Sequence, residues 1–300
     1  MEITIAGASG LIGTALIRSL ELGGHKVRRL NRGPAQAGGT FSWDPPAGEI
    51  DPAAIEGADA VVNLAGANLA GGRWTQKRKR LLRDSRVHST DLVARCIATR
   101  ASKPAVLVNM SGVGYYGTYP EDWVDESSAN GGGFLAGLCS DWESATDPAA
   151  TAGVRVVKLR SGVVIAREGG ALAKMLTVFK LGLGGPIGGG RMWLSWISIV
   201  DLVRVVERVI GDVQFSGAVN AVAPNPVTNS EFARELGRAL HRPAFVPVPA
   251  WALRIALGEM TDETLLASAR ARPGRLLDAG FEFRHEKIDA AFDALLRTRR

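Results

Sequence analysis

The feature that most constrains the fold is a glycine-spaced turn close to the start of the chain. Residues 2–6 are mainly apolar and predict a short β-strand, while residues 11–22 carry apolar side chains at helical spacing. Between them lies Gly7-Ala8-Ser9-Gly10-Leu11-Ile12-Gly13. In such a GxxGxxG turn the first glycine permits the tight bend, the second lets the backbone approach a diphosphate, and the third lets the helix pack on the strand. The motif therefore predicts a dinucleotide-binding βα unit.

The rest of the chain continues this alternation of strands and helices. Further strands are predicted over residues 27–30, 60–64, 105–110 and 154–159. Helices are predicted over residues 77–98, 135–150, 201–210 and 229–240, and the glycine-rich stretch 182–190 is predicted to be a loop. The alternation predicts an α/β fold: a Rossmann-type doubly wound parallel sheet with a smaller C-terminal substrate lobe.

Two domains are predicted from the point where this rhythm breaks. Residues 1–165 form the NADP-binding Rossmann domain in this interpretation. Residues 166–300 form the substrate lobe, with some strands returning to the sheet and a small C-terminal domain from about residue 245, where prolines gather.

The end of the second predicted strand indicates which dinucleotide is bound. An acidic residue there would hold the ribose hydroxyls of NAD, whereas an arginine suits the additional phosphate of NADP. The sequence reads Arg28-Arg29-Leu30-Asn31-Arg32-Gly33, with no Asp or Glu. Arg32 is the best-placed partner for the 2′-phosphate, because a guanidinium pairs well with phosphate oxygens. We therefore predict NADP(H) as the cofactor. The residues predicted to bind it are Gly7, Ser9, Gly10, Leu11, Ile12, Gly13, Asn31, Arg32, Leu64, Ala65 and Gly66.

Composition narrows the function classes further. The chain has 300 residues and a formal net charge of +6, which suits an anionic cofactor or substrate, and no nucleic-acid recognition module accompanies this charge. With only Cys96 and Cys139 and four scattered histidines, neither a disulfide framework nor a metal site is expected. No apolar stretch is long enough to span a bilayer, and no signal peptide is evident. We expect a cytoplasmic protein with a small-molecule substrate and no nucleic-acid or membrane partner, and a homodimer is left open.

Several motifs resemble those of a known superfamily. The opening glycine motif, Asn63-Leu64-Ala65-Gly66 and Tyr115-Tyr116-Gly117 are similar to the extended short-chain dehydrogenases/reductases. Further stretches resemble an atypical, epimerase-like branch, the sugar-nucleotide epimerase or cell-division-inhibitor-like proteins, including its small C-terminal domain. These stretches are Phe134-Leu135, Asp141-Trp142-Glu143, Gly169–Leu172, Gly182–Pro186, Ser195-Trp196-Ile197, Ala223–Asn229, Pro247-Val248-Pro249 and Leu257–Met260.

The resemblance implies a nicotinamide cofactor and, in catalytic members, a Ser/Thr with a Tyr-x-x-x-Lys pair. The tyrosinate would act as general acid/base, and the lysine would lower its pKa and bind the nicotinamide ribose. No Tyr-x-x-x-Lys occurs in this sequence. When the chain is registered on Glu143, Leu135 stands where the tyrosine belongs and Cys139 where the lysine belongs. Gly112 falls at the usual serine position, one residue after Ser111.

Other residues are therefore candidates for the chemistry. Tyr116 or its neighbour Tyr115 could supply a phenol, and either could instead be a packed aromatic. Ser111 is a candidate hydrogen-bond partner for cofactor or substrate, or a strand-end cap. Tyr116 and Ser111 are our catalytic candidates. The glycine-rich loop that follows residue 184 provides the candidate substrate contacts Arg191, Trp193 and Trp196, for which dimer contact or core packing is the alternative.

Two functions remain open from the sequence. The first is an NADP(H)-dependent oxidoreductase or epimerase-like enzyme acting on a small polar substrate, nucleotide-linked or not. The second is a non-catalytic NADP(H)-binding redox sensor or regulator. The missing Tyr/Lys pair favours the sensor, whereas the glycines and tryptophans of the substrate loop favour the enzyme.

Overall fold

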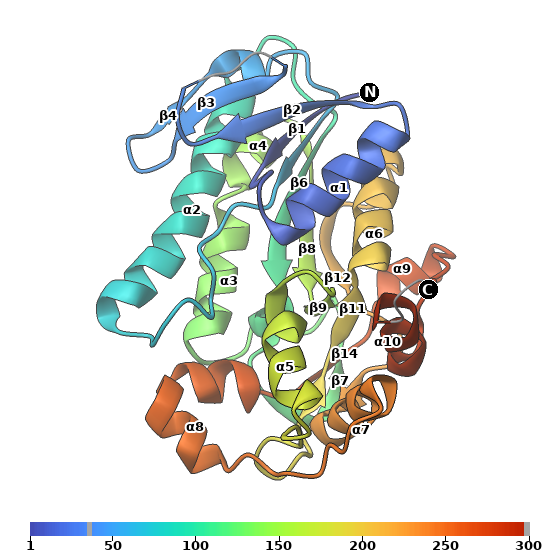
Figure 1. Ribbon diagram of the computed structural model, residues 1–300. Helices are drawn as coiled ribbons and strands as arrows, with labels where there is room; N and C mark the ends of the chain where they lie inside the picture. Colours follow the sequence, from blue (N-terminus) through green and yellow to red (C-terminus); the bar gives the residue numbers. More distant parts are fainter. Residues whose placement is uncertain (35–37, 297–300) are drawn as a thin grey trace.

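The structure is a computed structural model that describes residues 1–34 and 38–296. Its centre is an eight-stranded sheet with the order β12-β8-β6-β5-β1-β2-β3-β4 (Figure 1). All neighbouring strands are parallel except β3 and β4, which form an antiparallel edge pair. The strands of this sheet are β1 (Glu2–Ala6), β2 (Lys26–Asn31), β3 (Thr40–Asp44), β4 (Glu49–Ile50), β5 (Ala60–Asn63), β6 (Val106–Gly112), β8 (Arg155–Ser161) and β12 (Gly217–Ala221). The predicted doubly wound parallel sheet is confirmed.

Helices cover both faces of the sheet because both faces carry apolar side chains. On one face lie α1 (Leu11–Leu22) and α6 (Ile199–Gly211), which contact each other. On the other face lie α2 (Gln76–Ala98), α3 (Phe134–Ser144) and α4 (Asp147–Thr151). Strands β1, β5 and β6 read as nearly continuous buried runs, which is typical of parallel strands covered on both faces.

The second half of the chain returns to the sheet once and otherwise builds the lobe beyond it. Strand β12 adds to the sheet edge beside β8. The lobe has its own buried core, which includes Leu172, Phe179, Trp196, Phe232 and Phe292. One strand from the first half of the chain, β7 (Tyr119–Val124), pairs with β14 (Ala269–Ala271) of this lobe. The other elements of the lobe are β9 (Val163–Ile165), α5 (Gly170–Lys180), β10 (Trp193–Leu194), β11 (Trp196–Ser198), β13 (Val227–Thr228), α7 (Asn229–Leu240), α8 (Ala250–Leu257), α9 (Gly274–Asp278) and α10 (Ile288–Leu296).

Most predicted elements agree with the structure to within two residues, and one prediction was wrong. The single helix predicted over residues 135–150 is two helices, α3 and α4, separated by Ala145 and Thr146. Pro148 stands in the first turn of α4, where its missing N–H costs no hydrogen bond, but it could not continue α3. The chain between Lys180 and Trp193 contains no helix or strand, as predicted for the loop 182–190.

Candidate functional site

The glycine turn joins β1 to α1 in a conformation that only glycine supports. Gly7 has φ +79°, and a Cβ added there would lie 2.8 Å from the backbone carbon of Leu64 at the end of β5. A Cβ on Gly13 would lie 2.3 Å from the carbonyl oxygen of Gly7, so α1 could not pack against its own turn. These two close approaches are the roles that the motif predicts for its first and third glycines.

The start of α1 presents backbone amides rather than a side-chain cap. Gly10 is the N-cap residue, and no side chain hydrogen-bonds to the first turn. The Gly10 N–H donates to the Gly7 carbonyl at 3.0 Å, which closes the turn. Helix α1 begins at the carboxyl end of β1, and in the sheet β1 lies between β5 and β2. The strand order of the sheet reverses at this position. Helix amides at such a point form a cradle for the phosphates of a dinucleotide, so the residues present fit that group.

The three arginines at the end of β2 differ in their partners. Arg28 is ion-paired with Glu2 and donates to the carbonyl of Glu56 at 2.7 Å. Arg29 is ion-paired with Glu21. Arg32 is exposed and makes no hydrogen bond or ion pair with any of the described residues. Of the three guanidinium groups, that of Arg32 is therefore available to an anionic ligand, and Asn31 beside it is exposed as well.

The segment after β5 is the second wall predicted to line the cofactor. The Leu64 N–H donates to the carbonyl of Ala6, which joins this segment to the end of β1. The Ala65 N–H donates to Asn63 Oδ1 at 3.2 Å, and Gly66 is exposed. From the other side, Gly169 and Gly170 of the lobe pack against Leu11, since a Cβ on Gly169 would lie 3.1 Å from Leu11 Cδ1. The structure thus brings the predicted residues after β1 and β5 together with the start of α5.

Ser111 and Tyr116, the catalytic candidates, lie in a buried hydrogen-bonded network. Ser111 Oγ donates to Glu143 Oε1 at 2.8 Å. The same carboxylate receives two hydrogen bonds of 2.9 Å from Arg160, through Nε and Nη2. The Tyr116 hydroxyl donates to Asn220 Oδ1 at 2.7 Å and accepts from Arg160 Nη1 at 3.1 Å. Both candidates are engaged by neighbouring protein groups, and Tyr116 is fully buried.

The positions of the missing pair offer no obvious acid/base group. Leu135 packs against Gly114, and Cys139 Sγ lies 4.0 Å from the position of a Cβ on Gly112. Burial raises the pKa of the Cys139 thiol to about 11. Burial likewise raises the pKa of Tyr116 to about 12, against the opposing effect of Arg160. Both groups therefore keep their protons at neutral pH.

These raised pKa values predict a loss of stability in alkali. The unfolded chain releases the Cys139 proton near pH 9 and the folded chain only near pH 11, so rising pH between them favours unfolding. The shift corresponds to about 2 to 3 kcal/mol of stability that is present below pH 9 and lost by pH 11. Urea unfolding of wild type and Cys139→Ser across this range measures it. The expected result is a shallower decline in the variant, and identical slopes would contradict the assignment.

The predicted substrate residues separate into different environments. Arg191 is exposed. Trp193 is half-buried, with the Arg270 guanidinium 4.1 Å from its ring centroid. Trp196 is fully buried, and its indole Nε1 donates to the Asn225 carbonyl at 2.9 Å, so the structure places it in the core of the lobe.

Several residues of this region were not singled out from the sequence. Arg160, the buried partner of Glu143, is one case: strand β8 reads Arg-Val-Val-Lys-Leu-Arg-Ser, and its three basic residues give no local sign of which one is buried and paired. Glu263 is another: its carboxylate accepts the N–H groups of Phe134 and Leu135 at 3.1 and 3.0 Å. The C-terminal segment thereby caps the start of α3, a contact across more than a hundred residues that no local pattern could indicate.

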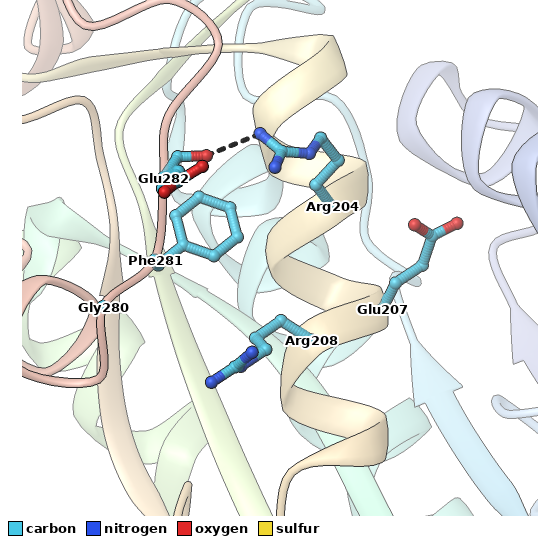
Figure 2. Close-up of a pocket in the computed structure, with 6 residues that line it drawn as sticks. All are labelled: Arg204, Glu207, Arg208, Gly280, Phe281 and Glu282. Atoms are coloured by element: carbon cyan, nitrogen blue, oxygen red, sulfur yellow. Dashed lines mark hydrogen bonds between the residues drawn. The ribbon is translucent and has the colours of Figure 1, made fainter.

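A shallow hollow elsewhere on the surface carries none of the predicted site residues (Figure 2). It lies between α6 and the segment Gly280–Glu282. Arg204 Nη1 donates to the Glu282 carbonyl at 2.7 Å, and Arg208 Nη2 lies 3.0 Å from Asp212 Oδ2. Its cations are engaged by the protein itself. Within the described residues, no cluster of His, Cys, Asp or Glu has the arrangement of a metal site, and no helix is long and apolar enough to cross a membrane.

Comparisons with known proteins agree with this geometry. Residues 3–221 match the model of the NAD dependent epimerase/dehydratase family, and residues 248–295 match a domain of unknown function, DUF1731. An epimerase family protein of Mycobacterium bovis, Mb2239, is 45% identical over 96% of this chain and 95% of its own length.

Two solved structures have the same fold and substantial sequence identity. The human epimerase family protein SDR39U1, solved with NADPH, has a TM-score of 0.89 and 34% identity, covering 98% of this chain and 99% of its own. A nucleoside-diphosphate sugar epimerase from Corynebacterium glutamicum has a TM-score of 0.82 and 35% identity, covering 99% of this chain and 58% of its own. The predicted class of cofactor, a nicotinamide dinucleotide, is thus confirmed at the level of the family. The chain belongs to the NAD dependent epimerase/dehydratase family, in the branch that carries the DUF1731 domain at its C-terminal end.

Proposed function

We propose that the protein binds NADP(H) at the β1–α1 turn and acts as an oxidoreductase or epimerase-like enzyme on a small polar substrate. The observation that carries the proposal is the glycine turn, whose uncapped helix amides lie at the reversal of strand order. NADP(H) is preferred over NAD(H) in this proposal because Arg32 is exposed and unpaired among the described residues. The relative solved with NADPH supports the same choice.

The Arg32 assignment predicts a specific loss of NADPH affinity. Arg32→Ala removes the charge-assisted hydrogen bonds to the 2′-phosphate, which are worth about 1.5 to 3 kcal/mol, or roughly 10- to 100-fold in Kd. NADH lacks that phosphate, so its affinity should change little. Isothermal titration calorimetry with both nucleotides measures the two effects. Arg29→Ala is the matched control, because Arg29 is ion-paired with Glu21 and should leave the preference intact. Equal affinities for NADPH in wild type and Arg32→Ala would exclude Arg32 as the phosphate partner.

For the substrate we propose Arg191 and Trp193 as contacts and treat Trp196 as a core residue that supports the loop. Ser111 and Tyr116 then act as positioning residues, since their hydroxyls hold the Glu143–Arg160 pair and Asn220. A catalytic acid/base would have to be supplied by another group or by the substrate. The cofactor, when bound, would supply or accept a hydride. The protein's own contribution is the phosphate cradle, the orientation of the nicotinamide and the walls around it.

The second candidate function is a non-catalytic NADP(H) sensor. It is favoured by Leu135 and Cys139 at the positions of the missing pair and by the high pKa values of Cys139 and Tyr116. Incubation with NADPH and a panel of carbonyl compounds and nucleotide sugars separates the two functions. Consumption of NADPH, or a changed sugar detected by NMR, supports the enzyme. Tight binding of NADPH without either change supports the sensor.

A further inference from the structure

Two segments of the C-terminal lobe contain no acidic residue. Residues 169–200 and residues 236–258 have neither Asp nor Glu, so all 30 acidic residues of the chain lie outside them. Each segment nevertheless has three basic residues. These are Lys174, Lys180, Arg191, Arg238, Arg242 and Arg254. A surface built from both segments therefore carries positive charge.

Hydrogen bonds hold the two segments side by side. The Val246 N–H donates to the Gly184 carbonyl at 3.1 Å, and Arg242 Nε donates to the Lys180 carbonyl at 3.1 Å. Helix α8 follows directly in the second segment. The loop after α5 and helix α8 lie together at the end of the molecule opposite to strands β3 and β4 (Figure 1).

The same end of the lobe exposes many large apolar side chains. Of the thirteen that are exposed among the described residues, seven lie in these two segments, which make up less than a fifth of the chain. The seven are Val178, Leu181, Leu183, Phe245, Val246, Trp251 and Ile255. Leu181 is 70% exposed and Phe245 is 75% exposed, so neither packs into the core of the lobe. Exposed apolar side chains gathered in this way mark an interaction surface.

The cations beside these side chains indicate the charge of the partner. Lys180 and Arg242 are exposed, and neither forms an ion pair with a carboxylate of the described residues, whereas Arg254 is paired with Asp262. A two-fold contact with a second copy of this chain would set the basic surface against itself, where like charges repel. The partner that fits is therefore negatively charged and accepts apolar side chains.

We propose that this end of the lobe binds the surface of a membrane that contains anionic lipids. Leu181, Phe245 and Trp251 enter the boundary between headgroups and acyl chains, which favours apolar and aromatic side chains. Lys180 and Arg242 stay at the level of the lipid phosphates, to which the negative surface potential attracts them. Such binding uses exposed side chains rather than a spanning helix. It departs from the expectation of no membrane partner, and it does not depend on the proposed function.

Co-sedimentation of the full chain with lipid vesicles tests the proposal. One set of vesicles contains phosphatidylglycerol and phosphatidylcholine in equal parts, and the other contains phosphatidylcholine alone. A cation at an anionic surface contributes about fivefold to the partition coefficient, so two cations should favour the anionic vesicles by about tenfold or more. Added salt should weaken this preference, because it screens the surface potential.

Variants of exposed residues separate the apolar contribution from the charge. Phe245→Ser should lower partitioning into anionic vesicles by about tenfold or more, since a large apolar side chain no longer leaves water. Lys180→Gln/Arg242→Gln should lower it by a similar factor. Leu22→Ser and Arg18→Gln are the matched controls, because Leu22 is 81% exposed and Arg18 is exposed on α1, outside this surface. Both controls should sediment like wild type, and all variants should keep its Tm.

Several results would overturn the proposal. Equal sedimentation with both kinds of vesicle would exclude recognition of anionic lipid. Sedimentation with neither kind would leave an acidic protein surface as the occupant. A dimer seen by sedimentation velocity without vesicles, and lost in Phe245→Ser, would identify a second copy as the occupant. Unchanged binding of Phe245→Ser to anionic vesicles would also contradict the proposal, since charge alone would then account for the binding.

Discussion

Gly13→Ala is expected to lower NADPH affinity by about 100-fold or more, equivalent to roughly 3 kcal/mol of binding free energy. The added Cβ would lie 2.3 Å from the Gly7 carbonyl oxygen and 2.9 Å from that of Ala8. Both contacts are to backbone, which cannot move aside as a flexible side chain could. Helix α1 must shift away from the turn, and its first amides would no longer converge on a diphosphate.

The measurement is calorimetric titration of NADPH into the variant, with circular dichroism to confirm the fold. Gly137→Ala is the matched control, since Gly137 lies within α3 and an added Cβ meets nothing within 4 Å. That variant should bind NADPH normally and gain about 0.5 to 1 kcal/mol of stability from the lower entropy of its unfolded chain. If Gly13→Ala bound NADPH as tightly as wild type, the turn would not be the phosphate cradle.

The second large effect is a loss of stability, which we expect when the buried Arg160–Glu143 ion pair is broken. Glu143→Gln leaves Arg160, whose side chain is 5% exposed, without a counter-charge and weakens the bond from Ser111. Breaking one partner of such a pair costs about 3 to 5 kcal/mol, a large part of the stability of a typical domain. Urea unfolding should show this loss as a lower midpoint.

The double variant Glu143→Met/Arg160→Met distinguishes the effect of an unpaired buried charge from the effect of altered packing around the pair. With both charges removed, no uncompensated ion remains, so most of the lost stability should return. The Tyr116 hydroxyl keeps its bond to Asn220 in this variant. The single variants Glu143→Met and Arg160→Met provide the comparison. If the double variant lost as much free energy of unfolding as these two single variants lose together, the broken ion pair would not be the cause of the loss. Glu143→Gln matching wild type in its midpoint would contradict the network.

The sheet and the turn after β1 could be predicted because each depends on patterns formed by residues that are close together in the sequence. The alternation of apolar strands and periodic helices specifies the doubly wound architecture, and the spacing of Gly7, Gly10 and Gly13 specifies the tight turn between β1 and α1. The break between α3 and α4 was missed because apolar periodicity continues past Pro148, although that residue could have indicated it. The short edge strands β3 and β4 pair by register that only the folded sheet provides.

The interior of the candidate site was less accessible to prediction. Arg160, Glu143 and Asn220 lie on three different elements; Arg160 bonds directly to Glu143 and reaches Asn220 through the Tyr116 hydroxyl only in the folded chain. Tyr116 was a candidate acid/base from its position in a motif, but its exposure and partners depend on this long-range packing. Arg86 belonged to a basic run that is mostly solvated or ion-paired, and its burial is a property of α2 against the segment after β5. Charge in a sequence does not indicate which cations lack a partner.

The central claim is that the amides at the start of α1 hold the diphosphate of a nicotinamide dinucleotide. Isothermal titration calorimetry of the unaltered protein with NADPH and with NADH tests it most directly. We predict saturable binding of one NADPH per chain, tighter than that of NADH by about tenfold or more, because in our proposal Arg32 binds the 2′-phosphate that NADH lacks. Absence of binding by both nucleotides would contradict the claim.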